Sequence, residues 1–407
     1  MTRRLVAVAL LTLMAGPALA MAAGEEAAPA AGAVPRVEPV NAADILKALP
    51  VATPLHRKLK LLRRAQDDIV RGQRQGAEDQ RRLLGEMAAL FESPDYWRLF
   101  TPADVTAIAA YVLSGGRPDV AERAAQLDSI TPQDRRLLQG VAYYGRGLIR
   151  EARDRLDDME TRQFPALLAG QITMVQGLIR DDTDYGRRMQ LLERAMNSVP
   201  GTMVEEAALR RVVVLAAVRG DGAMFLRAAR RYSARFAASL YAREYHDSLV
   251  ASLARLAGAV PPLDWVQADQ VLAHEPREDR AEIYLGLARM GIAMGRADLC
   301  LHGGRRALRL ALEGSVPARQ ALLHVLACRV AQGDATAADL GQIDMDGLSA
   351  GDVSLWRAAQ RMAAAMAAAP RLGRAAAAGE PPAPEAQAAA AATAMAKAAE
   401  ILRRAKP

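Results

Sequence analysis

The chain has 407 residues and a net charge of +7, and its basic side chains are scattered along its length. Hydrophobic residues make up 51% of it but aromatic residues only 4%. Scattered arginines are typical of solvated helix faces and argue against nucleic-acid binding, which favours a basic cluster. Small apolar residues suit closely packed helices, and few alternating β-branched runs occur, so we expect an all-α fold.

Residues 1–20 have the pattern of a secretory signal peptide. Arg3 and Arg4 form its positive start, an apolar segment follows, and small residues up to Ala20 predict cleavage before Met21. The apolar segment is too short to span a bilayer, and no later apolar run is long enough. We therefore expect a periplasmic protein with no stable membrane insertion after signal removal; the alternative is an uncleaved anchor.

Four regions follow from composition. Residues 21–53, rich in alanine and proline, are expected to form a disordered leader after the signal at 1–20. Residues 54–362 carry the helical pattern, with a soft break near 260–276 where prolines interrupt it. Residues 363–407 are expected to form an alanine- and proline-rich linker and a mobile C-terminal helix.

The first firm helix is predicted at 54–71, with its partner at 77–91. Leucines of the first helix share one face, whereas Arg63 and its basic neighbours are assigned to the other. The acidic pair Asp67–Asp68 is interpreted as part of a solvated surface or as a helix cap. Further helices are predicted at 103–113, 134–144 and 149–159, the first two of which begin with Thr-Pro.

The hairpin at 134–159 resembles a tetratricopeptide repeat, with Gly140, Tyr143, Ala152 and Leu156 at the small, aromatic, small and large positions. Turn glycines recur because the hairpin bend favours a positive φ. Further units are expected at 165–200, 203–236, 281–312 and 318–343. The predicted fold is therefore a helix-hairpin solenoid of degenerate tetratricopeptide-like repeats.

The clearest predicted helix lies between Thr202 and Gly220. Thr202 and Glu205 have capping-box spacing, and Gly220 is suited to the left-handed residue that ends a helix. Glu206 and Arg210, four residues apart, are predicted on its exposed side as a favourable ion pair.

No pattern of catalytic, cofactor-binding or metal-binding residues rises above background. The five histidines are isolated, and no glycine-rich stretch follows a strand in a phosphate-binding pattern. We therefore expect a non-enzymatic protein with no cofactor and no small-molecule substrate. Cys300 and Cys328 are the only cysteines. They fall in successive predicted helices, where a disulfide bridge and two buried free thiols are both compatible with the sequence.

Trp97, predicted in a loop, and Tyr111, near a helix end, are candidate interface residues. Core packing is the alternative for each.

Three segments stand out together: Leu59–Gly72, Ala110–Gly116 and Pro200–Arg211. In sequence and in order, these segments resemble the MotC family, periplasmic motility proteins of some flagellated Gram-negative bacteria. The resemblance implies a non-enzymatic protein beside the flagellar motor that binds the periplasmic part of the stator protein MotB.

A candidate interface surface comprises Glu205, Glu206, Arg210 and Arg211. For Glu205, helix capping alone is the alternative. Two other functions remain compatible with the pattern: a general tetratricopeptide-like envelope adaptor, and a helical accessory to a peptidoglycan-active enzyme.

Overall fold

The computed structural model describes residues 53–181, 183–259 and 262–368. Within these residues the chain is all helical, with no strand, which confirms the predicted all-α class. The predicted signal peptide with its cleavage site, most of the leader, and nearly all of the predicted linker and C-terminal helix lie outside the described residues.

The helices of the first half are α3 (Pro54–Val70), α4 (Arg74–Glu92), α5 (Pro94–Arg98), α6 (Pro102–Leu113), α7 (Pro118–Ala125), α8 (Pro132–Gly145), α9 (Ile149–Leu156), α10 (Ala166–Ile179) and α11 (Tyr185–Ser198). Those of the second half are α12 (Met203–Arg219), α13 (Gly222–Phe236), α14 (Ala242–Leu256), α15 (Trp265–Leu272), α16 (Arg277–Ala293), α17 (Ala297–Leu310), α18 (Val316–Gln332), α19 (Ala337–Gly341) and α20 (Ala350–Ala368).

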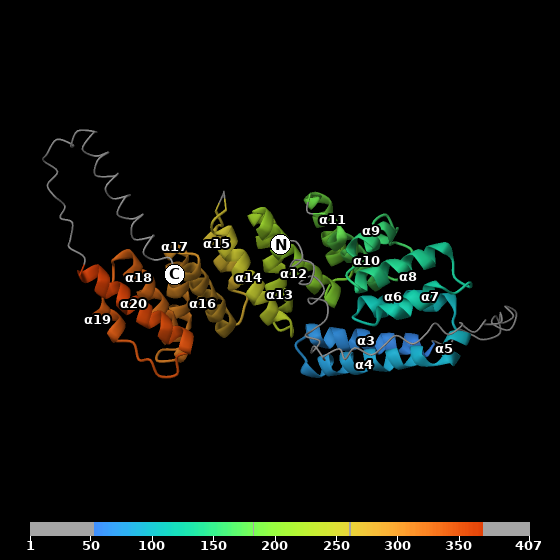
Figure 1. Ribbon diagram of the computed structural model, residues 1–407, viewed down its shortest axis with the longest axis horizontal. Helices are drawn as coiled ribbons and strands as arrows, with labels where there is room; N and C mark the ends of the chain where they lie inside the picture. Colours follow the sequence, from blue (N-terminus) through green and yellow to red (C-terminus); the bar gives the residue numbers. More distant parts are fainter. Residues whose placement is uncertain (1–52, 182, 260–261, 369–407) are drawn as a thin grey trace, which may run out of the picture.

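Consecutive helices pack as antiparallel pairs, and the pairs follow one another along the long axis of the molecule (Figure 1). Gly220 ends α12 with φ 74°, as its position in the sequence predicts. In the hairpin that resembles a tetratricopeptide repeat, a Cβ added at Gly140 of α8 would lie 2.5 Å from the side chain of Leu156 in α9. A small residue is therefore required there, and the predicted helix-hairpin solenoid is confirmed.

Several elements differ from the sequence prediction. Trp97 lies in the short helix α5 and not in a loop, and α7 and α14 were not predicted. Across the expected soft break, α15 forms, and one apolar core continues from Leu256 through Leu263 to Val271. The last described helix runs to Ala368, past the predicted end of the repeat region.

The first hairpin folds back along the solenoid, so that α3 packs against both α6 and α12 (Figure 1). Its apolar face explains this position: Leu55, Leu59 and Leu62 join the N-terminal core, whereas Val70 joins the central core. The backbone N–H of Leu240 donates a hydrogen bond to the carbonyl oxygen of Ile69, 3.1 Å away. The hairpin therefore connects two cores formed by distant parts of the sequence.

Helix α12 lies at the centre of this arrangement, in contact with α3, α10, α11, α13 and α14. Glu206 is fully buried and Arg210 is 4% exposed, so the prediction that they lie on an exposed side is wrong. The reason is that later helices cover them: Tyr232 of α13 donates a hydrogen bond to Glu206, and Arg210 lies over the ring of Tyr241 and pairs with Glu244 of α14. The predicted capping box is also wrong: the hydroxyl of Thr202 donates to the carbonyl of Val199, and Glu205 accepts from the N–H of Gly201.

Candidate functional site

A cavity of about 310 Å³ lies where α3 crosses α6, α10 and α12. Helix α3 contributes the polar side chains Arg63, Gln66 and Asp67 to its wall. Leu167 and Met174 of α10 contribute apolar surface. A concave site with an apolar lining and a few convergent polar groups is typical of a ligand-binding pocket.

The position of α3 in this wall is fixed at both ends. At its start, the hydroxyl of Thr53 accepts a hydrogen bond from the backbone N–H of His56 and donates one to Asp104 of α6, 3.1 Å away. At its end, Gly72 lies so close to Ala238 that an added Cβ would stand 2.2 Å from the carbonyl oxygen of Ala238. The cavity wall is therefore held by contacts outside the cavity itself.

The opposite wall includes the first turns of two helices. Ala166 and Leu167 begin α10, and Met203 and Val204 begin α12, and all four line the cavity. Neither helix has a side chain that caps its first N–H groups. Uncapped N–H groups and the positive end of the helix dipole favour negative charge nearby.

Three polar side chains in the wall have an atom without a hydrogen-bond partner in the structure: Nε of Arg63, Oε1 of Gln171 and Nε of Arg210. Gln171 is 6% exposed and uses its amide nitrogen to donate to the hydroxyl of Ser114, 3.3 Å away. Arg210 donates to Glu244 at 3.3 Å and lies over the ring of Tyr241. Each of these three buried atoms therefore retains hydrogen-bonding capacity.

The two charged side chains of α3 have shifted pKa values. Burial lowers the pKa of the Arg63 guanidinium. Burial also raises the pKa of the Asp67 carboxyl, against the smaller opposing effect of Arg71. Both shifts have the direction expected when burial removes a charged group from water and opposite charges nearby do not offset the loss.

A network of buried charges lies behind the cavity, on the far side of α12. Glu205, which is fully buried, pairs with Arg231 and with Arg235 of α13. Glu206 accepts a hydrogen bond of 2.9 Å from the hydroxyl of Tyr232, and burial raises its pKa. These contacts connect α12 to α13 and hold the helix whose first turn lines the cavity.

The three segments that carry the family resemblance meet at this cavity. Leu59–Gly72 supplies Arg63 and Asp67, Ala110–Gly116 supplies Ser114, and Pro200–Arg211 supplies Arg210. These segments lie far apart in the sequence, and the folding-back of α3 brings them together.

Most of the predicted interface residues have their side chains inside the chain. Trp97 is 6% exposed and donates from its ring nitrogen to the carbonyl of Phe91 at 2.8 Å, and Tyr111 is 1% exposed. Glu205, Glu206 and Arg210 are buried, as described above. Arg211 is partly buried, and burial lowers its pKa. The structure shows packing roles for these residues, and their contact with another protein stays a prediction.

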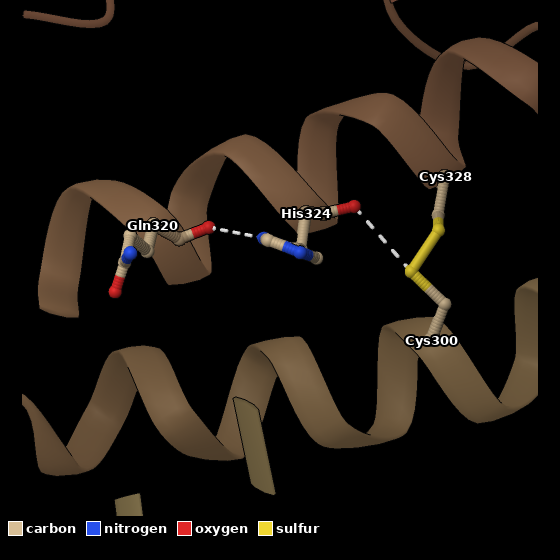
Figure 2. The surroundings of a disulfide bond; sticks show 4 residues. All are labelled: Cys300, Gln320, His324 and Cys328. Atoms are coloured by element: carbon tan, nitrogen blue, oxygen red, sulfur yellow. Dashed lines mark hydrogen bonds between the residues drawn. A yellow bond between two sulfur atoms is a disulfide. The ribbon is translucent and has the colours of Figure 1, made fainter. Parts of the chain in front are cut away.

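Cys300 of α17 and Cys328 of α18 form a disulfide, which resolves the alternatives that the sequence leaves open (Figure 2). Beside it, the imidazole of His324 lies 2.7 Å from the carbonyl oxygen of Gln320. Burial lowers the pKa of His324. The bridge therefore links two successive hairpins at a buried position.

Sequence reasoning missed the cavity because it assigned Arg63 and Asp67 to a solvated face of the first helix. Gln171 carried no signal at all, since one glutamine in an apolar helix is common. The sequence offered one signal that could have indicated the cavity: Arg63 and Asp67 lie four residues apart within a segment that carries the family resemblance. No helix among the described residues is both long and apolar enough to span a membrane.

Comparison with known proteins gives a consistent result. The family model described as "Chemotaxis protein MotC" matches residues 1–406. A protein named "Chemotaxis protein MotC" from Rhizobium meliloti (strain 1021) is 28% identical over 263 residues, which is 64% of this chain and 59% of that protein. The aligned part of the chain thus spans less than two thirds of that relative. No solved structure matches.

Proposed function

Because this chain belongs to the MotC family, we propose that it acts in bacterial motility as a non-enzymatic scaffold in the periplasm, where it binds the periplasmic part of the stator protein MotB. The family match over residues 1–406 is the observation that carries the motility role. A solenoid of paired helices supports the scaffold role, since stacked helices offer an extended surface on which another protein's segment can lie.

We propose the exposed side of α3 as the first contact face to test. Arg57, Lys60 and Arg64 are all exposed and follow one another at helical spacing of three and four residues. Leu61, which is 45% exposed, lies between them. None of the three cations has an ion-pair partner among the described residues, so their charge is available to attract an acidic segment of a partner.

The experiment combines binding with motility. Purified mature protein is titrated with the periplasmic part of MotB from the same organism, and a strain lacking the gene is scored for swimming in soft agar. We expect direct binding, and swimming that is impaired although flagella are assembled. Normal swimming together with no binding would refute the proposal.

The contact face is tested with the triple variant R57E/K60E/R64E. We expect it to weaken MotB binding and to reverse the salt dependence of that binding, because the new carboxylates repel an acidic segment and added salt screens that repulsion. The matched control reverses three exposed arginines on other helices, Arg305, Arg309 and Arg357. Equal losses in both triple variants would show that net charge alone matters.

Impaired swimming without MotB binding would favour a second function, that of a general tetratricopeptide-like envelope adaptor. A partner with peptidoglycan-cleaving activity would favour the accessory role. Both alternative functions are compatible with the same fold and differ from the first only in the partner protein.

A further inference from the structure

Two side chains of opposite charge project from one helix into the wall of the same cavity. Arg63 and Asp67 lie one turn apart on α3, and both line the cavity. Each is only partly exposed, and no ion pair joins either of them to another described residue. Partly buried charges without partners destabilise a fold, so a ligand that neutralises both would gain free energy by binding there.

The other walls add groups that favour each end of such a ligand. The uncapped first turn of α10, together with Nε of Arg210, favours a negatively charged group, whereas the first turn of α12 already carries Glu205 and Glu206. Gln171 is 6% exposed, and its Oε1 atom accepts no hydrogen bond. This atom therefore favours a hydrogen-bond donor on the ligand. A ligand with both a carboxylate and an ammonium group satisfies the groups that favour an anion and those that favour a hydrogen-bond donor.

A ligand with one charge fits these walls less well. A simple anion would face the carboxylate of Asp67, and a simple cation would face Arg63 and the first turn of α10. Leu113, Leu167 and Met174 supply apolar surface that suits a short hydrocarbon side chain. The volume of about 310 Å³ is at the small end of the range for small-molecule sites.

We propose that this cavity binds a small zwitterion with an apolar body, of the class of the free apolar α-amino acids. The carboxylate lies toward Arg63, Arg210 and the first turn of α10. The ammonium lies toward Asp67 and Gln171. This site is separate from the contact with MotB, and it is tested on the purified protein alone.

The first experiment measures thermal unfolding of the purified protein with each of six amino acids: L-alanine, L-valine, L-leucine, L-isoleucine, L-methionine and L-phenylalanine. A ligand that binds only the folded state raises the unfolding midpoint with concentration. We expect a saturable rise for at least one of them. If none of the six raises the unfolding midpoint at millimolar concentration, the proposal is refuted and the cavity holds solvent only.

The second experiment tests the two charges of the ligand by calorimetric titration of the wild-type protein. If L-leucine is the ligand found, N-acetyl-L-leucine lacks the ammonium and L-leucinamide lacks the carboxylate; the same pair of derivatives exists for the other five. Each derivative is expected to bind at least about tenfold more weakly, because each loses a charge-assisted hydrogen bond. Equal affinity of either derivative and the parent would overturn the assignment of a zwitterion.

The third experiment tests the two side chains. Arg63→Gln and Asp67→Asn are each expected to raise the Kd about tenfold or more. The matched control is Arg64→Gln, which removes an exposed charge from the next position of α3 and should leave the Kd unchanged. The unliganded variants should unfold at or above the wild-type midpoint, because each loses a partly buried charge without a partner. Unchanged affinity in both variants would refute the site.

Discussion

The backbone N–H of Leu240 donates a hydrogen bond of 3.1 Å to the carbonyl oxygen of Ile69, which fastens the end of α3 to the loop between α13 and α14. The chain turns immediately afterwards at Gly72, where φ is 81°. This contact keeps the first hairpin in place over α12, and so it defines one wall of the cavity.

The variant Gly72→Ala should loosen that attachment. An added Cβ would meet the carbonyl oxygen of Ala238 at 2.2 Å and would also strain the backbone, so we expect a loss of about 2–4 kcal/mol in the free energy of unfolding. The control is Gly295→Ala, where φ is 67° and no atom lies within 4 Å of the added Cβ. It should lose only about 1–2 kcal/mol. Equal losses in urea unfolding would contradict a tight contact at Gly72.

Removal of the disulfide between Cys300 and Cys328 should destabilise α17 and α18. The bridge closes a loop with a sequence separation of 28 residues, for which chain entropy gives a stabilisation of about 3–4 kcal/mol. We expect the double variant C300S/C328S to unfold at lower temperature than the oxidised wild type. A reducing agent should lower the midpoint of the wild type and leave that of the double variant unchanged. A wild-type midpoint indifferent to reductant would show that the bridge does not form in solution.

The carboxyl group of Glu206 should make stability depend on pH. Burial raises its pKa in the folded state above the ordinary value of 4.5, so the folded protein binds this proton more tightly than the unfolded chain. Its contribution to stability is fully present below pH 4.5 and is lost as the pH rises through the raised value. The free energy of unfolding of E206Q relative to wild type should therefore increase with pH above 4.5.

The matched control for that series is E78Q, which removes an exposed carboxylate from α4. Chemical unfolding of the three proteins at several pH values between 4 and neutral gives the comparison. A difference between E206Q and wild type that stays constant over this range would rule out a raised pKa at Glu206.

Trp97 provides a test of packing against partner contact. Its ring packs in the N-terminal core beside Phe91 and under Arg123, so W97A should lose about 3–5 kcal/mol of stability. W97F should lose less, since it keeps most of the apolar surface and removes the hydrogen bond to the Phe91 carbonyl, worth about 1 kcal/mol. The control L99A, at a side chain that is 75% exposed, should be nearly neutral. A W97A variant of normal stability with weakened MotB binding would instead support an interface role.

Local patterns in the sequence were sufficient for the fold class and for most hairpins. Periodic leucines and Thr-Pro starts predicted α3, α6 and α8, and Gly220 and Gly295 turn where expected, because these signals act within a few neighbouring residues. Helix α7 was missed because it has eight residues and follows Gly-Gly-Arg-Pro, a sequence that usually indicates a turn.

Contacts between distant segments explain the remaining errors. Glu206 and Arg210 have the spacing of an exposed ion pair, and nothing near them in the sequence indicates that Tyr232 and Tyr241, from later in the chain, cover them. For the same reason Arg63 and Asp67 were assigned to solvent, although they line a cavity that α12 completes. Whether a charged side chain on one helix is exposed or buried depends on which other helix packs beside it. A single sequence does not show which helices pack together.

The backbone hydrogen bond between Leu240 and Ile69 also means that α3 is synthesised before the loop onto which it docks. Because the chain emerges from its N-terminus, α3 exists well before the loop that it docks onto has been made. Until then Val70, which joins the central core, lacks its later partners there, although the leucines of α3 already pack in the N-terminal core, so the end of the young hairpin is exposed to proteases. Truncations that stop before residue 240 lose this contact together with the later part of the central core, and should accumulate poorly.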